Sequence, residues 1–101
     1  MKIIDYCGNE LELTNERWQH IITEHPEVKK YKKRLSEVVS APNLVKRSNS
    51  DRAVLLYYRY YADIFGGKYL LAVVKIQKRP FLLTCYVTDR IKEGKLIWQR
   101  N

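Results

Sequence analysis

The two histidines are the side chains of this sequence best suited to moving protons near neutral pH. They are His20 and His25, five residues apart. Pro26 disfavours helical geometry at the residue before it, so we expect His25 at the end of a helix. Each also has an ordinary interpretation, His25 as a structural hydrogen-bond donor at a helix junction and His20 as an exposed helix residue. Because histidine can transfer protons near neutral pH, both residues are nevertheless candidates for a general base or acid.

Hydroxyl groups recur along the segment from Phe81 to Asp89, which we expect to be a strand. Strand side chains alternate between two faces. One set is apolar and suits a core: Phe81, Leu83, Cys85 and Val87. The other set would lie on the opposite surface: Leu82, Thr84, Tyr86 and Thr88. The second set presents three hydroxyl groups.

Two cations are expected beside these hydroxyls. If the apolar sides of strands 53–61 and 69–76 share the core, Arg59 and Lys75 lie on the surface that carries Thr84, Tyr86 and Thr88. Such a surface suits a phosphate and could stabilise its charge during a reaction. An ordinary solvent-facing sheet gives a similar pattern, because Thr and Tyr are favoured in strands. The candidate catalytic residues are His20, His25, Arg59, Lys75, Thr84, Tyr86 and Thr88.

A run of cations follows Pro26. It consists of Lys29, Lys30, Lys32, Lys33 and Arg34. These residues could bind the phosphates of a nucleic acid. The same run could equally be the solvated face of a helix.

The remaining pattern predicts the elements that position these residues. We expect short strands at 2–6 and 10–13, a helix at 16–24 capped by Thr14 or Asn15, and a helix from Pro26 to about Ser40. The two predicted helices carry apolar stripes, which consist of Trp18, Ile21, Ile22, Val28, Tyr31, Leu35, Val38 and Val39. Strands are expected at 44–48, 53–61, 69–76, 81–89 and 95–98. This order predicts an α+β fold with two N-terminal helices packed on one face of an antiparallel meander sheet.

The composition sets the class of protein. A chain of 101 residues fits one domain, residues 1–101, and its net charge of +8 favours a polyanionic partner. Cys7 and Cys85 form no disulfide or zinc pattern, so we expect both to be reduced in a cytoplasmic protein. We see no signal peptide, no membrane-spanning stretch, no metal-ligand cluster and no cofactor-binding motif.

Several spaced motifs resemble one nuclease group. They are Trp18-x-His20-Ile21-x-x-x-His25-Pro26-Glu27, Ala41-Pro42-Asn43, Tyr69-x-x-x-Val73-Val74-Lys75, Thr84-x-Tyr86-x-Thr88-Asp89 and Gly94 with Trp98. The group is the phage- and prophage-associated branch of the barnase–EndoU–colicin–RelE-like (BECR) nucleases. The resemblance implies a helical part packed on an antiparallel sheet. It also implies a metal-independent endoribonuclease, often a toxin or effector, with its site on the open sheet face.

Carried over by position, the resemblance places the site on His20 or His25 with Lys75, Thr84, Tyr86 and Thr88. RelE-type members often lack a catalytic histidine and rely on basic residues, so Arg59 and Lys75 could contribute more to catalysis. The expected substrate is RNA such as tRNA or mRNA, and the expected partner is an acidic antitoxin or immunity protein. Two alternatives stay open. One is a non-catalytic nucleic-acid-binding module, and the other is a basic protein-interaction domain.

Overall fold

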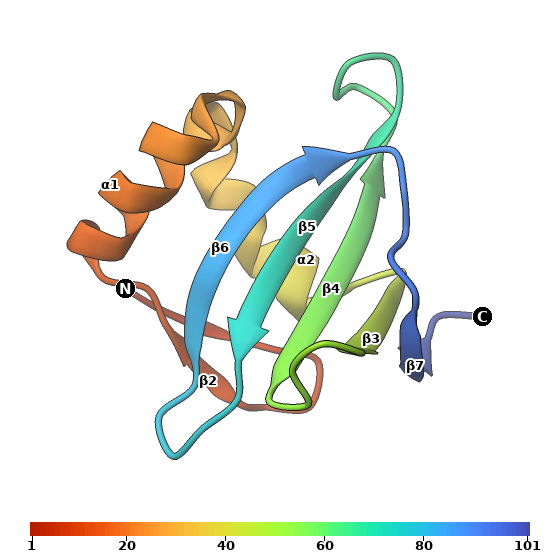
Figure 1. Cartoon of the computed structure of the whole chain (residues 1–101). Helices are drawn as coiled ribbons and strands as arrows, with labels where there is room; N and C mark the ends of the chain where they lie inside the picture. The colour runs from red at the N-terminus through yellow and green to blue at the C-terminus, as the bar shows by residue number, and fades with distance from the viewer.

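The computed structural model describes residues 1–101 as an α+β fold. A helical segment packs against one side of a curled seven-stranded mixed sheet. In Figure 1 the first helix, in orange, lies beside β6, and the last part of the segment, in yellow, lies behind β4 and β5. The strands are β1 (Lys2–Ile4), β2 (Glu10–Glu12), β3 (Leu44–Ser48), β4 (Val54–Tyr61), β5 (Lys68–Lys75), β6 (Phe81–Thr88) and β7 (Gly94–Gln99).

The sheet has the strand order β1-β2-β6-β5-β4-β3-β7. Strands β3 to β6 pair antiparallel with their neighbours in sequence, and β7 crosses back to pair with β3. The expectation of an entirely antiparallel sheet is wrong at one place, because β2 runs parallel to β6 where Glu12 faces Phe81. The N-terminal hairpin, β1 with β2, thus extends the sheet along only the first residue of β6.

The helical segment has three parts. Helix α1 (Asn15–Glu24) begins at Thr14, whose hydroxyl accepts a hydrogen bond from the Arg17 amide at 3.1 Å. It ends before Pro26, as the sequence predicts. A 3₁₀ helix, η1 (Pro26–Arg34), and helix α2 (Leu35–Ser40) follow. None of these helices has the length and hydrophobicity that a membrane-spanning helix needs.

The single α-helix predicted for residues 26–40 is wrong in its first part. Residues of η1 repeat every three positions, which aligns Val28, Tyr31 and Arg34 on one face. Val28 and Tyr31 are buried there, and Arg34 reaches Asp63. The 3₁₀ winding therefore places Val28 and Tyr31 in the core and Arg34 beside Asp63, in the loop after β4.

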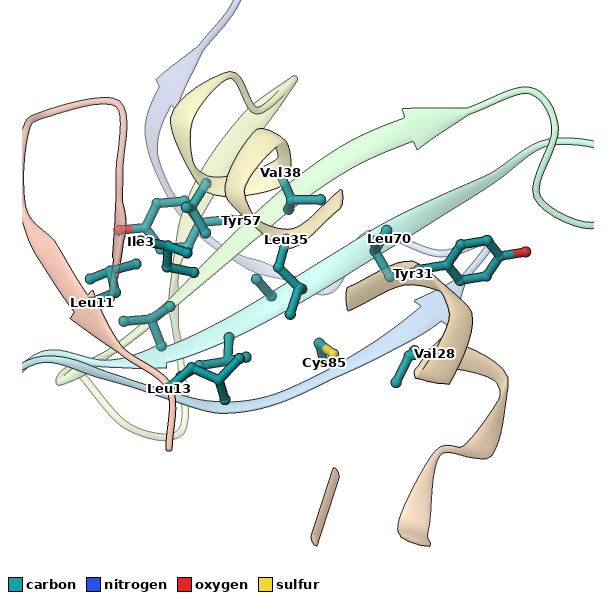
Figure 2. Close-up of a cluster of buried hydrophobic side chains, with 14 of the residues drawn as sticks. Ile3, Leu11, Leu13, Val28, Tyr31, Leu35, Val38, Tyr57, Leu70 and Cys85 are labelled. Carbon is teal, nitrogen blue, oxygen red and sulfur yellow. The ribbon is translucent and has the colours of Figure 1, made fainter. Parts of the chain in front are cut away.

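The main core lies between the helical segment and the sheet. The predicted stripe residues Trp18, Ile21, Val28, Tyr31, Leu35, Val38 and Val39 are all buried. Figure 2 shows helical side chains such as Leu35 facing Leu70 and Cys85 on the sheet. Only Ile22 of the predicted stripes is half-buried.

The opposite face of the sheet is not the polar surface that strand alternation suggested. It carries a second cluster of buried apolar side chains: Leu44, Val54, Leu56, Tyr58, Leu71 and Val73. Ile91, in the connection from β6 to β7, packs against this cluster. The amide of Lys92 donates a hydrogen bond to the Tyr58 hydroxyl at 3.0 Å. This face, called the open face below, therefore has an apolar centre.

The predicted alternation of β6 fails at its beginning. The register shifts so that Thr84 faces Val73 while Leu82 faces Val74, which leaves Leu83 as an extra residue. Leu82 consequently belongs to the main core, and Leu83 packs against the open-face cluster. From Thr84 onward the predicted faces are correct: Cys85 is in the main core and Tyr86 is on the open face.

Candidate active site on the open face

His25 contacts Tyr86, a residue of the open face. Their rings stack, with centroids 5.0 Å apart and planes at 25°. The His25 side chain is 31% exposed, so solvent and a ligand can reach it. Its Nδ1 lies 3.9 Å from Oε2 of Glu27, beyond hydrogen-bond length. A proton-transfer group thus stands beside a phenol.

The local chain geometry explains why His25 reaches β6. The His25 amide donates to Ile21 O at 2.7 Å, and its carbonyl accepts from the Val28 amide at 3.1 Å. Pro26 ends α1, so the backbone turns at His25. Because β2 pairs with β6 only at Phe81, the rest of that edge of β6 is open to the junction between α1 and η1. The histidine therefore comes from the helical side but meets a side chain of the open face.

Lys92 supplies a positive charge beside this pair. Its ammonium lies 5.7 Å from the centre of the Tyr86 ring. A hydrogen bond with the Tyr86 side chain, more than any other cause, raises the pKa of Lys92. A raised pKa keeps the ammonium charged through neutral pH. Sequence reasoning missed Lys92, which falls in the connection predicted as a turn and had no strand pattern to assign it a face.

Lys75 and Thr84 share the open face with Tyr86, but they lie further along the sheet. Lys75 is four residues from Leu71, the neighbour of Tyr86, which corresponds to about 13 Å along a strand. Its ammonium forms an ion pair with Asp51. The Thr84 hydroxyl is covered by other atoms and has no hydrogen-bond partner. Neither group points freely at a ligand beside His25.

Thr88 is the last residue of β6, and its hydroxyl forms hydrogen bonds with the backbone of Arg90. Its hydroxyl accepts from the Arg90 amide at 3.1 Å and lies 3.2 Å from Arg90 O. Thr88 faces Tyr69 across β5, so it lies on the open face as predicted. The local bonds make it a turn former at the start of the connection that carries Lys92.

Arg59 lies on the opposite side of the sheet, so the prediction that it shares a surface with Lys75 is wrong. It faces Leu70, a residue of the main core. Its guanidinium donates to the Ala41 carbonyl, and its Nε lies 3.3 Å from Glu37. Both faces of β4 are rich in apolar residues, so alternation alone could not assign its orientation. Arg59 joins β4 to the end of α2.

His20 is also separated from the open-face residues. It is exposed on α1, one turn from Glu16 and Glu24, and lines a hollow of about 450 Å³ with them. Trp18 and Ile21 occupy the buried side of the same helix. The structure thus distinguishes the two histidines, which the sequence left as equal candidates.

The basic run of η1 is partly engaged in intramolecular contacts. Arg34 pairs with both oxygens of Asp63 at 2.9 and 2.6 Å, and this hydrogen-bonded pairing raises the pKa of Arg34. The ammonium groups of Lys30 and Lys32 lie over aromatic rings, those of Tyr31 and Trp18 respectively. Lys29 and Lys33 are exposed and form no ion pair. Within the run only Arg34 is paired with a carboxylate, and the binding of the run to nucleic-acid phosphates stays a prediction.

A hollow of about 1020 Å³ lies away from these residues, between the N-terminal hairpin and the loop 77–80. Glu10, Glu12, Lys78 and Arg79 are among the residues that line it. Its charges are mixed and it contains no histidine. No three metal-ligating side chains gather anywhere in the structure. The His25–Tyr86 pair is therefore the better candidate site on chemical grounds.

Comparison with known proteins leaves the resemblance to BECR nucleases as a prediction. No protein-family model, curated protein or solved structure matches this chain.

Proposed function

We propose that this protein is a metal-independent endoribonuclease of the BECR-like type, with His25 at its centre. The observation that carries the proposal is the stacked His25–Tyr86 pair on the open face, with the Lys92 ammonium beside it. Cleavage of RNA without a metal needs a base, a proton donor and a cation for the phosphate. These three side chains supply one of each. The net charge of +8 further favours a polyanionic substrate.

The reaction assigned to this site is transfer of the phosphate within the RNA chain. His25 takes the proton of the ribose 2′-hydroxyl, and the 2′-oxygen forms a bond to phosphorus. The bond from phosphorus to the 5′-oxygen breaks, and that oxygen receives a proton from the Tyr86 phenol. The phenolate then regains a proton from water, and His25 releases its proton to water, which restores both residues. The products are a 2′,3′-cyclic phosphate and a 5′-hydroxyl end. Lys92 stabilises the negative charge that grows on the phosphate.

The test is cleavage of a 5′-labelled single-stranded RNA in EDTA, with products identified by mass spectrometry. We expect His25→Ala to slow cleavage by about 10²- to 10⁴-fold, the usual contribution of a general acid or base. His20→Ala is the matched control and should cleave like the unmodified protein, because His20 lies on the exposed side of α1. Intact RNA with the unmodified protein, or equal loss in both variants, would refute the proposal.

A further inference from the structure

Tyrosines on the open face extend away from the His25–Tyr86 pair. Tyr58 faces Leu71, which faces Tyr86, and Tyr60 faces Tyr69, which faces Thr88. The Tyr69 ring makes edge contacts with Tyr58 and Tyr60, at centroid distances of 5.9 and 5.5 Å. Tyr58 is fully buried, whereas Tyr60 is 48% exposed. Tyr60 is therefore the outermost ring of a continuous aromatic group.

Tyr60 is exposed but is held in place. Its amide donates to Oδ1 of Asn43 at 2.6 Å, which fixes the backbone at the end of β4. Its ring meets Tyr69 at 74°, an edge-on contact, and no aromatic ring of the protein stacks on it. Its hydroxyl occupies the space that a side chain at Gly67 would need, and Gly67 has a φ of +114°. A large aromatic surface held this way loses little conformational entropy when a ligand binds.

Tyr60 lies on the same face of the sheet as Tyr86, at a distance that a short stretch of RNA can span. Strand spacing and rise put Tyr60 and Tyr86 about 12 Å apart, two strands across and two residues along. The Lys92 ammonium lies near the Tyr86 ring, and the Lys46 ammonium donates to the Lys92 carbonyl at 3.3 Å. A flexible single strand can span such a distance with neighbouring nucleotides.

We infer that Tyr60 is the stacking platform for an unpaired base next to the phosphate held at His25. The substrate class is therefore single-stranded RNA, because the bases of a duplex are stacked on one another and show only their edges. This inference rests on the proposed function for the position of the reacting phosphate. Stacking on an exposed tyrosine is tolerant of base identity, so it selects unpaired nucleotides rather than a sequence.

The test measures binding separately from cleavage. The probe is a fluorescein-labelled 2′-O-methyl RNA of eight nucleotides, which has no free 2′-hydroxyl and cannot be cleaved by the proposed reaction. Fluorescence anisotropy at fixed salt gives the Kd for the single strand and for the same strand in a duplex. We expect tighter binding of the single strand, and Tyr60→Leu should weaken it about 5- to 100-fold.

Two variants control for a general change in the protein. Tyr60→Phe keeps the ring and should bind within about twofold of the unmodified protein. Ile4→Ala removes an apolar side chain of similar exposure, 45%, at β1 on the far edge of the sheet, and should not change the Kd. A 2-aminopurine base in the probe should lose fluorescence on binding to the unmodified protein but not to Tyr60→Leu.

The outcomes separate this inference from the proposed function. Tyr60-dependent binding by a protein that leaves RNA intact would retain the stacking site and reject the nuclease. Cleavage that depends on His25, with equal Kd values for Tyr60→Leu and the unmodified protein, would retain the nuclease and overturn the stacking site. Equal affinity for single strand and duplex would also overturn it.

Discussion

Asp5 and Tyr57 form the most deeply buried polar contact of the protein. The Asp5 carboxylate accepts hydrogen bonds from the amides of Cys7 and Asn9 at 2.9 and 2.8 Å. The Tyr57 hydroxyl donates to its other oxygen at 2.7 Å. Burial, followed by this bond to Asp5, raises the pKa of Tyr57, so the phenol stays a donor. One carboxylate thus shapes the N-terminal turn and ties it to β4.

Removing the Tyr57 hydroxyl should weaken the fold measurably. We expect Tyr57→Phe to lower the free energy of unfolding by about 1.5–3 kcal/mol, the range for a hydrogen bond to a charged group. Tyr61→Phe is the matched control, because Tyr61 donates to Glu37 at 2.6 Å in an exposed position. It should cost less than about 1 kcal/mol. Urea denaturation checks both, and equal losses would contradict the special role of the buried bond.

The two cysteines should differ in reactivity. Cys85 is fully buried in the main core, and burial raises the pKa of its thiol to about 12. Cys7 is exposed. At pH 8 we expect iodoacetamide to modify one thiol of the folded protein, at Cys7, and both thiols in urea. Mass spectrometry of the labelled peptides decides the result, and labelling of Cys85 in the folded protein would show that β6 opens to solvent.

At the level of elements, the extra residue in β6 determines which leucine supports the core. Leu82 is fully buried between the helices and the sheet, whereas Leu83 is partly exposed on the open face. We expect Leu82→Ala to cost about 2–5 kcal/mol of unfolding free energy. Leu83→Ala should cost at least about 1 kcal/mol less. Urea denaturation measures both, and the reverse order would mean that β6 alternates without a bulge.

These elements also show how far the sequence could predict the fold. Turn residues, the cap at Thr14 and the helical stripes predicted most boundaries, because each has a local cause. The bulge had no local signal, since Leu82 and Leu83 are both apolar and fit either face. The same ambiguity in β4 placed Arg59 on the wrong side. Sequence alternation orients a strand only where its two faces differ in polarity.

At the level of the whole molecule, the candidate site depends on packing that no segment encodes alone. His25 and Tyr86 are far apart in the sequence and meet because η1 and α1 pack along the open edge of β6. Their residue types could be recognised in the sequence, but not their contact. The open face could be recognised only in part, because its apolar centre comes from the tertiary contacts of Leu56, Tyr58 and Leu71.

The charge balance of the whole molecule predicts a loss of stability in acid. Three carboxylates hold surface contacts together. Pairing with Lys75 lowers the pKa of Asp51, pairing with Arg34 lowers that of Asp63, and a hydrogen bond from Tyr61 lowers that of Glu37. A pKa that is lower in the folded state stabilises the protein above the ordinary value of about 4. That stabilisation disappears as the pH falls through the lowered values.

Protonation also increases self-repulsion, because neutralising the 11 carboxyl groups raises the net charge above +8. We therefore expect the free energy of unfolding to be nearly constant from about pH 7 to 5 and to fall below about pH 4. Urea denaturation at each pH measures it, and added salt should restore part of the loss by screening the positive charges.

A variant with Asp51→Asn, Asp63→Asn and Glu37→Gln should have a lower free energy of unfolding at pH 7, and that free energy should fall less steeply in acid. An identical slope in that variant would mean that these contacts are not what acid removes.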